Sequence, residues 1–329
     1  MIHHGSGKGA MPSVASPIGM TVAIPTLGKS PHLRGLLERL KRQIVDFNFE
    51  VLVVANLPSQ ELRQMVQSIA ANFIYLETGR LGVNVARNKA LDKSRGEIIL
   101  FLDDDIVIQT DDILQRHREA HARFPHAVGI GGPYQLVSPH SPWEVAYHQV
   151  AHQWLDRSRL DGTETTQLLG GNMSLKRELL HLHFDENILF GGSEAALCQQ
   201  LVLSGKRLHI LPELIIGHSP EITKRIFIRK AFLQGKGAKR REETMAELPS
   251  QHVNEWLHRS VPPLYARQFA RGQQQKTRLF RPLAAIRKLY TILSNLNAPS
   301  LFSDGSKPTE RVSMPHIASH TSMTRETAE

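Results

Sequence analysis

The stretch GVNVARNKALDKSRGEIILFLDDDI, residues 82–106, decides the fold class of this protein. Its first part, VARNKALDKS, predicts a helix, and after Gly96 the chain continues with the apolar run IILFL and three aspartates. Five consecutive apolar residues are typical of a strand that is buried on both faces. A helix followed by such a strand belongs to the repeating unit of a parallel sheet.

The same alternation of strand and helix extends toward the N-terminus. Helices are predicted for HLRGLLERLKRQI at 32–44 and ELRQMVQSIAANF at 61–73, and strands for TVAIPTL at 21–27, EVLVVAN at 50–56 and FIYLET at 73–78. The first strand should break at Pro25. The pattern predicts an α/β fold with a mostly parallel, doubly wound sheet and helices on both faces.

The second half of the chain is less regular. We expect strands at 127–136 (AVGIGGPYQL) and 207–218 (RLHILPELIIGH), and a helix at 141–155. The segment QLLGGNMSLKRELL at 167–180 is predicted to be a strand that leads through a glycine turn into a helix. A further helix should begin after Gly191-Gly192, with Ser193 as its N-cap and Gly205 at its C-terminal end.

These elements predict four regions along the chain. Residues 1–19 and 300–329 have the polar, Ser-rich composition of disordered segments. Residues 20–235 should form the main α/β domain, and 236–299 a basic helical extension in which Pro262–Pro263 interrupts the helices.

Composition narrows the classes of function. The single cysteine, Cys198, excludes intrachain disulfides and a cysteine-rich zinc site, and it fits a reducing cytoplasm. No stretch of about 20 apolar residues predicts a membrane span, and the first residues are too polar for a signal peptide. We therefore expect a cytoplasmic protein.

The basic charge is concentrated in the last third. Of the net charge of +9, residues 219–329 supply 19 Lys and Arg against 9 Asp and Glu. Such a bias indicates a solvated basic face, or a surface for anionic lipid or polyphosphate on the cytoplasmic side of a membrane. Nucleic acid is not an expected partner, because no helix-turn-helix, zinc-finger or RNP-like pattern is present and aromatic residues are only 6%.

Three carboxylates end the strand that precedes Ile106. Side chains alternate along a strand, so Asp103 and Asp105 should converge while Asp104 points away. Two hard oxygen ligands suit Mg²⁺ or Mn²⁺ beside a phosphate. The alternative is that the aspartates only end a strand, as Asp111-Asp112 only cap the following helix.

Three other positions are candidates for chemistry. His218 follows an apolar strand and is either a ligand at the strand end or a structural histidine. Glu194 lies in the first turn of a helix and is either a general base or a partner of the helix dipole. Arg87-Asn88, which should open a helix after Gly82, would hold ribose or phosphate, or cap the helix at the surface.

Taken in order, these segments resemble family-2 glycosyltransferases of the GT-A fold over residues 20–235. The matching pieces are AIPTLG, GVNVARNKALDKSRGEIILFLDDDI, GGNMSLKREL and FGGSEAALCQQLVLSGKRLHILPELIIGH. The resemblance implies an inverting, metal-dependent enzyme that transfers a sugar from a nucleoside-diphosphate sugar to the hydroxyl of a saccharide or lipid-linked saccharide.

The resemblance also implies residue roles. Asp105 and His218 would bind Mn²⁺ or Mg²⁺, and Glu194 would be the catalytic base, with Asp185 or Glu186 as alternatives. The nucleotide-sugar would contact a set of residues at the strand ends: Pro25, Thr26, Asn56, Arg87, Asn88, Asp103, Asp104, Gly171 and Asn172.

Two positions depart from the family pattern. Ala55 stands where the family carries an acidic residue that reads the base, with Asn56 next, so the base is left open. Ser193-Glu194 replaces the family's Glu-Asp pair. Two other functions remain as alternatives: a sugar-phosphate nucleotidyltransferase, although no Gly-rich, Lys-bearing loop follows the first strand, and a catalytically degenerate nucleotide-sugar-binding protein.

Overall fold

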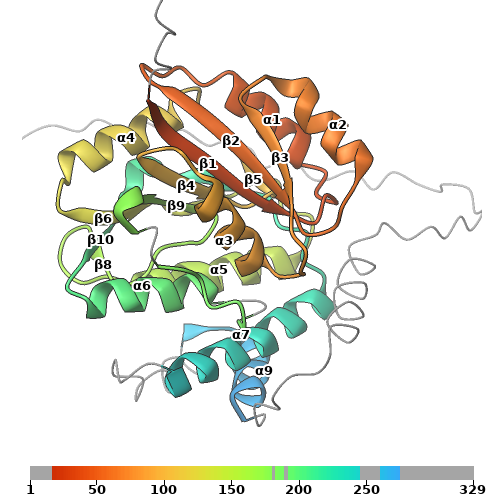
Figure 1. Ribbon diagram of the computed structural model, residues 1–329. Coiled ribbons are helices and arrows are strands. Elements are labelled where there is room, and N and C mark those ends of the chain that lie inside the picture. The colour runs from red at the N-terminus through yellow and green to blue at the C-terminus, as the bar shows by residue number, and fades with distance from the viewer. Residues whose placement is uncertain (1–16, 180–181, 189–191, 245–259, 275–329) are drawn as a thin grey trace, which may run out of the picture. The chain divides into compact units, whose positions relative to one another are not determined.

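The computed structural model describes residues 17–179, 182–188, 192–244 and 260–274. All of them belong to one compact unit. Its centre is an eight-stranded sheet (Figure 1), with the strands in the order β3 (Phe73–Glu77), β2 (Asn48–Ala55), β1 (Ile18–Thr26), β4 (Ile98–Leu102), β9 (Asn172–Lys176), β6 (Ala127–Gly131), β10 (Arg207–Ile210) and β8 (Glu164–Thr165). A smaller sheet has the order β5 (Ile106–Val107), β11 (Ile216–His218) and β7 (Tyr134–Leu136).

Helices alternate with these strands. They are α1 (Leu33–Lys41), α2 (Gln60–Ile69), α3 (Val83–Lys93), α4 (Ile113–Arg123), α5 (Pro142–Ser158), α6 (Ser193–Leu203), α7 (Lys224–Thr244) and α9 (Pro263–Gln274). Strands β1 to β4 are parallel, and β9 is antiparallel to both β4 and β6. The predicted α/β fold with a mostly parallel sheet is confirmed.

The strand order alone indicates the edge of the sheet at which ligands bind. From β1 the chain moves outward to β2 and β3, and then returns across β1 to β4. Because crossovers between parallel strands are right-handed, α1 and α2 cover one face and α3 the other. The order reverses between β1 and β4, and such switch points open a crevice at the carboxyl ends of the strands. Thr26 and Asp103 lie there.

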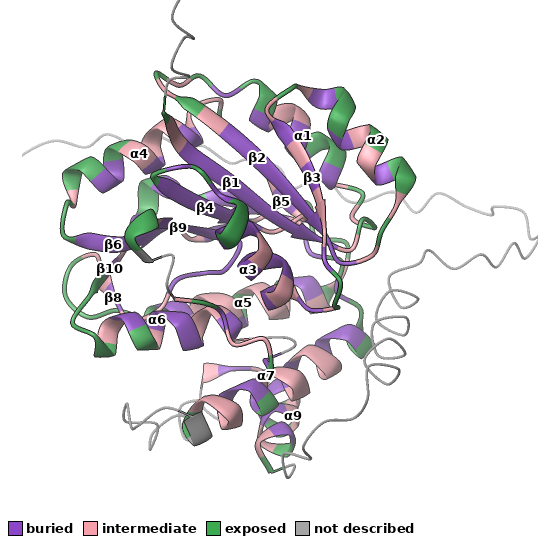
Figure 2. Cartoon of the chain, in the orientation of Figure 1, coloured by how far each residue is buried: buried purple, intermediate pink, exposed green. Residues whose placement is uncertain are grey.

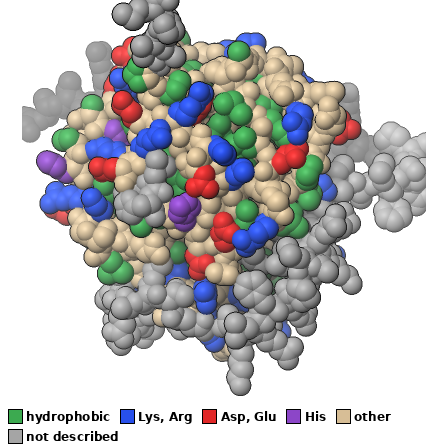
Figure 3. Space-filling model, viewed as in Figure 1, with side chains coloured by type: hydrophobic (Ala, Val, Ile, Leu, Met, Phe, Trp, Pro, Cys, Tyr) green, Lys and Arg blue, Asp and Glu red, His purple; other side chains and the backbone are tan. Residues whose placement is uncertain are grey.

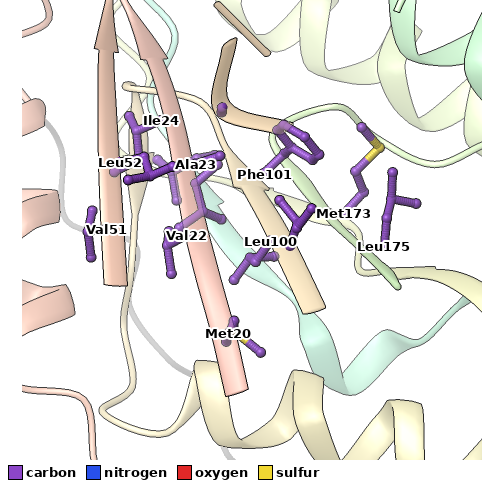
Figure 4. Close-up of a cluster of buried hydrophobic side chains, with 14 of the residues drawn as sticks. Met20, Val22, Ala23, Ile24, Val51, Leu52, Leu100, Phe101, Met173 and Leu175 are labelled. Carbon is purple, nitrogen blue, oxygen red and sulfur yellow. The ribbon is translucent and has the colours of Figure 1, made fainter. Parts of the chain in front are cut away.

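The core is built from the apolar runs that the sequence showed. Figure 4 shows side chains of β1, β2, β4 and β9 packed together, among them Val22, Leu52, Phe101 and Met173, and all four are at most 1% exposed. Figure 2 shows the central strands buried while the outer sides of α1, α2 and α4 are exposed. A Cβ on Gly96 would lie 2.3 Å from the Thr21 backbone nitrogen, so only glycine permits β4 to begin this close to β1.

Several predicted boundaries are wrong. Strand β1 begins at Ile18, inside the segment predicted to be disordered, and continues through Pro25 to Thr26. Pro25 is tolerated because the pairing of β1 with β4 ends at Ala23, so no bond to β4 is lost there. Arg87 and Asn88 lie in the middle of α3 and do not open it, because the helix begins at Val83.

Three segments of the second half also differ from expectation. Residues 127–136 divide into β6 and β7 in different sheets, since the chain turns at Gly132, where a Cβ would lie 2.0 Å from the Leu214 carbonyl oxygen. Residues 207–218 divide into β10 and β11, because a 3₁₀ turn at Pro212–Leu214 interrupts them. Strand β9 follows the Gly170-Gly171 turn instead of preceding it, and ends in a 3₁₀ turn at Arg177–Leu179.

The residues that cap the helices lie close to the predicted positions. Gly192, in a left-handed conformation, is the N-cap of α6, and Ser193 is its first residue. Gly205 has φ +77° and follows the C-cap Ser204, as in the helix ends that glycine favours. Asp112 is the N-cap of α4, but its side chain pairs with Arg116 and makes no capping bond.

The C-terminal helices have a core of their own. Helices α7 and α9 pack on each other and α7 packs on α5, around Phe227, Tyr265 and Phe269 (Figure 1). The Tyr265 hydroxyl donates to Gln234 at 2.5 Å, and Trp154 of α5 donates to the same hydroxyl at 3.4 Å. The boundary proposed between 235 and 236 stays a prediction, and it falls inside α7. The predicted tail 300–329 and residues 1–16 lie outside the described residues.

Candidate active site

The three aspartates form the turn between β4 and β5, and each has a different partner. Asp103 Oδ1 lies 3.2 Å from Arg87 Nη2, and Asp105 Oδ2 lies 3.4 Å from His218 Nε2. Asp104 accepts a hydrogen bond of 2.5 Å from Thr26 Oγ1. Asp104 thus joins the turn to the end of β1, whereas Asp103 and Asp105 have partners on other elements; the prediction that Asp104 points away from them stays a prediction.

His218 reaches Asp105 through the small sheet. Strand β11 pairs with β5 so that His218 lies opposite Ile106, the residue after Asp105. The ring of Tyr134 stacks on His218 with 4.4 Å between centroids, and His152 of α5 bonds the Tyr134 carbonyl oxygen at 2.9 Å. Two segments more than 100 residues apart thus place an imidazole nitrogen beside a carboxylate.

The two side chains fit a divalent cation. Asp105 Oδ1 and His218 Nδ1 are buried and have no hydrogen-bond partner. The facing atoms Oδ2 and Nε2 are separated by 3.4 Å, close to the spacing of about 3 Å between adjacent ligands of an octahedral ion. Within the described residues no three His, Cys, Asp or Glu side chains gather as a complete metal site. The remaining ligands would come from a bound phosphate and water.

Burial and neighbouring groups shift the pKa values of the aspartates at this turn. Burial and the charge of Asp105 raise the pKa of Asp104 to about 7. Burial also acts to raise the pKa of Asp105, but the charge and hydrogen bond of His218, with the charge of Lys230, outweigh it and lower this pKa to about 2. The site therefore holds an ionised Asp105 at neutral pH, next to the carboxyl groups of Asp103 and Asp104.

Arg87 connects this turn to the start of α6. Its guanidinium donates to Ser193 Oγ at 3.0 Å, to the Gly170 carbonyl oxygen at 3.1 Å and to Asp103 Oδ1 at 3.2 Å, and lies 3.6 Å from Glu194 Oε2. The side chain of Arg87 is only 4% exposed. It was predicted to line the nucleotide pocket, and for this nearly buried side chain that role stays a prediction.

Glu194 is brought to the same edge as the aspartates. It also accepts a hydrogen bond of 3.0 Å from Ser193 Oγ and is 21% exposed, so one face of the carboxylate is accessible. Arg241 of α7 donates to the Gly192 carbonyl oxygen at 3.1 Å. The alternative bases are engaged otherwise: Asp185 lies 3.6 Å from Arg240 and Glu186 lies 2.6 Å from Arg80.

Three of the predicted ligand-binding side chains are buried and hydrogen-bonded within the protein. Asn88 exchanges hydrogen bonds with the Phe184 backbone, and Asn56 donates to Thr78 and to the Gly82 carbonyl oxygen. Asn172 is 0% exposed, because its amide donates to the Leu214 carbonyl oxygen and its oxygen faces His117 Nε2 at 3.3 Å. These three side chains hold the loops whose backbone borders the site.

Gly171 does lie at the site. A Cβ there would come within 2.6 Å of the Asp103 carboxylate and 2.7 Å of Tyr134 Oη, and its backbone nitrogen donates to that hydroxyl at 2.9 Å. A larger residue at this position would force the Asp103 carboxylate or the Tyr134 hydroxyl to move. Pro25 and Thr26 end β1 on the opposite side of the same turn.

Sequence reasoning missed Tyr134, His117 and the basic residues of α7. Tyr134 follows a glycine turn in a stretch that seemed to be one strand, and His117 lies on an ordinary amphipathic helix. Only the alternation of apolar and basic residues in KRIFIRKAFLQGKGAKRR hinted that one face of α7 is buried.

The model of the family "Glycosyl transferase family 2" matches residues 21–184. This chain belongs to glycosyl transferase family 2. The match includes β1 to β4, the aspartate turn and β9, and it ends before α6.

Curated relatives support the family over short stretches. The chain is 31% identical over 114 residues to the uncharacterized glycosyltransferase YfnE of Bacillus subtilis, covering 34% of this chain and 29% of that protein. It is 38% identical over 71 residues to an uncharacterized protein of Haemophilus influenzae, covering 20% and 38%. The matched parts are well under half of the length of these relatives.

Solved structures share the fold over more of the chain. The mannosyltransferase PcManGT of Pyrobaculum calidifontis, in complex with GDP-Man and Mn²⁺, has a TM-score of 0.55 and 19% identity, covering 87% of this chain and 84% of that one. Staphylococcus aureus TarS has a TM-score of 0.51 and 18% identity, covering 80% and 46%. At these identities the likeness establishes the GT-A fold.

Proposed function

We propose that this protein is an inverting glycosyltransferase that moves a sugar from a nucleoside-diphosphate sugar to the hydroxyl of a saccharide or lipid-linked saccharide. The observation that carries the proposal is the meeting of Asp105, His218 and Glu194 at the switch point of the sheet, with Arg87 between Asp103 and Glu194. The resemblance to proteins that bind GDP-Man or UDP supports a nucleotide donor.

The residues suggest a single displacement. Glu194 would take the proton of the acceptor hydroxyl as its oxygen bonds the anomeric carbon, while the bond from that carbon to the diphosphate breaks. Asp103 would orient the donor, and Arg87 would keep Asp103 and Glu194 in register. Asp105 and His218 would hold a Mn²⁺ or Mg²⁺ ion, which supplies positive charge to the departing diphosphate.

Nucleotide binding should depend on a divalent ion. In calorimetric titrations of GDP and UDP, Mn²⁺ should increase the affinity relative to EDTA by about 10-fold or more, because the ion joins phosphate to Asp105. Asp105→Asn should abolish this increase. Asp112→Asn is the matched control, since Asp112 lies at a helix end and pairs with Arg116. Equal affinity in EDTA and Mn²⁺ would contradict the metal-dependent part of the proposal.

Transfer activity tests the function itself. A panel of UDP-, GDP-, dTDP- and CMP-sugars is assayed by thermal shift, since a bound donor raises apparent stability by mass action. The stabilising donor is then supplied with saccharide and lipid-linked acceptors, and release of free nucleotide is measured. Donor binding without release from any acceptor would support the catalytically degenerate alternative.

We further propose that α7 rests on anionic lipid at the cytoplasmic face of a membrane. No helix among the described residues is both long and apolar enough to cross a bilayer. Lys224, Arg225 and Lys236 are exposed on α7, whereas Figure 3 shows acidic and basic side chains interspersed on the face in view. A basic cluster gains about 1 kcal/mol per residue near anionic lipid.

Vesicle sedimentation measures this contact. Replacing Lys224, Arg225 and Lys236 by Gln should lower partitioning onto vesicles with anionic phospholipid by about 100-fold, as three such contributions predict. The control replaces Arg34, Lys41 and Arg42, which are exposed on and beside α1, and should leave partitioning unchanged. Equal losses from both triple variants would indicate a general charge effect and contradict a specific role of α7.

A further inference from the structure

The first turn of α6 is held from two sides by arginines of distant helices. Arg87 of α3 donates to Ser193 Oγ at 3.0 Å and lies 3.6 Å from the Glu194 carboxylate. Arg241 of α7 donates to the Gly192 carbonyl oxygen at 3.1 Å. The first arginine therefore contacts the side chains of this turn, and the second contacts its backbone. Arg241 lies beyond residue 184, where the match to the family ends.

The Gly192 carbonyl oxygen also accepts the first hydrogen bond of α6, from the Ala196 nitrogen at 3.3 Å. A carbonyl oxygen has two lone pairs, so it can accept from Ala196 and Arg241 together. Gly192 has φ +72°, and a Cβ there would collide with Arg241 Nη1. The guanidinium thus occupies the place of a side chain at the N-cap. The orientation of this peptide sets the direction in which α6 begins, and Glu194 follows two residues later.

The packing of α7 on α9 fixes the position of Arg241. A Cβ on Gly235 would collide with the Phe269 carbonyl oxygen, and one on Gly272 would collide with the Phe232 carbonyl oxygen. Glycine at both positions allows the backbones of the two helices to approach each other closely. This contact lies about two helical turns before Arg241, so the end of α7 has little freedom to shift along α6.

We propose that Arg241 is a positioning residue for the general base: it fixes the first turn of α6 so that Glu194 meets the acceptor hydroxyl. This inference rests on the proposed function. A base must lie within hydrogen-bond reach of the proton that it removes, and a displacement of about 1 Å can cost about 10²-fold in rate. The C-terminal helices then belong to the catalytic unit, although Arg241 itself contacts no reacting atom.

Turnover tests whether Arg241 acts through Glu194. Rates at saturating donor and acceptor are compared for wild type, Arg241→Met, Arg241→Lys, Glu194→Gln and the double variant of Arg241→Met with Glu194→Gln. Arg241→Met should lower turnover by about 10- to 100-fold with donor affinity unchanged. Arg241→Lys keeps a charged donor and should recover most of the rate. The double variant should be no slower than Glu194→Gln alone, because an absent base cannot be misplaced.

Hydrogen exchange tests the contact without any substrate. In Arg241→Met the Ala196 amide should exchange about 10-fold faster than in wild type, since a charged hydrogen bond to its acceptor peptide is lost. Arg240→Met is the matched control. It removes the neighbouring guanidinium, which lies 3.6 Å from Asp185 and is 35% exposed. This control should leave the exchange of Ala196 and the turnover within a few-fold of wild type.

Four results would overturn the inference. Arg241→Met may turn over sugar at the wild-type rate, or leave the exchange of Ala196 unchanged. The losses in the double variant may instead multiply, which would show that Arg241 acts independently of Glu194. If Arg241→Met does not fold, as checked by urea denaturation, the role of Arg241 is structural. If the wild type transfers no sugar to any acceptor, the proposed function fails, whereas the exchange of Ala196 still shows whether Arg241 holds α6.

Discussion

Glu194→Gln should lower the turnover of sugar transfer by about 10²–10⁴-fold while donor affinity stays nearly constant. A positioned general base contributes this much to a rate, and glutamine removes only the basicity. The amide can still accept from Ser193 Oγ, which now bonds the carboxylate at 3.0 Å, so the start of α6 should keep its conformation. Steady-state rates at saturating donor and acceptor measure the effect, and donor titration checks the affinity.

Two control variants distinguish a base from a carboxylate that only stabilises the helix. Asp185→Asn and Glu186→Gln change the carboxylates that pair with Arg240 and Arg80 near the same loop. Both should retain turnover within a few-fold. If Glu194→Gln transfers sugar at the wild-type rate, Glu194 serves only the helix dipole; a large loss in either control instead would move the role of base to that residue.

Arg87→Met should destabilise the fold by about 3 kcal/mol and abolish transfer. The guanidinium is nearly buried and satisfies four acceptors on three elements. Removing one partner of a buried ion pair typically costs about 3–5 kcal/mol, because the remaining charge is left uncompensated. Here Asp103 and Glu194 are partly exposed, which places the expected loss at the low end. Urea denaturation measures it.

Arg80→Met provides the comparison. Arg80 also pairs with a carboxylate, Glu186 at 2.6 Å, but its side chain is 55% exposed. Exposed pairs contribute about 0–1 kcal/mol, so this variant should unfold at nearly the wild-type urea concentration. Equal destabilisation by the two variants would show that Arg87 has no special part in joining the aspartate turn to α6.

The sequence by itself determined the sheet and the position of its functional edge. Apolar runs such as IILFL need burial on both faces. The helices between them bury these faces when the strands form a parallel sheet covered by helices on both sides. The carboxylates at the end of that run therefore lie at the ligand-binding edge whatever the rest of the chain does. The pairing of Asp105 with His218 was implied only by the resemblance to family 2, because His218 reaches this edge through β11 of the smaller sheet.

Local rules failed where the chain turns for tertiary reasons. Gly132 lies so close to the Leu214 carbonyl oxygen that no side chain fits, and this contact, 82 residues away in sequence, divides an apolar stretch into strands of two sheets. Pro25 remains in β1 because the pairing of β1 with β4 has already ended at Ala23. Neither fact is visible in the spacing of residues along one segment.

Only the tertiary structure decided which polar side chains near the aspartates are satisfied by distant loops. Asn172 and Asn88 have the composition of binding residues, yet each is satisfied by groups from distant loops and is buried. Lys230 and Arg241 read as part of a solvated basic helix, yet Lys230 lies over the Tyr147 ring of α5 and Arg241 donates to the Gly192 carbonyl oxygen before α6. The physical reason is that apolar periodicity specifies which face of an element is buried, whereas the partner of a polar group depends on which distant elements that burial brings together.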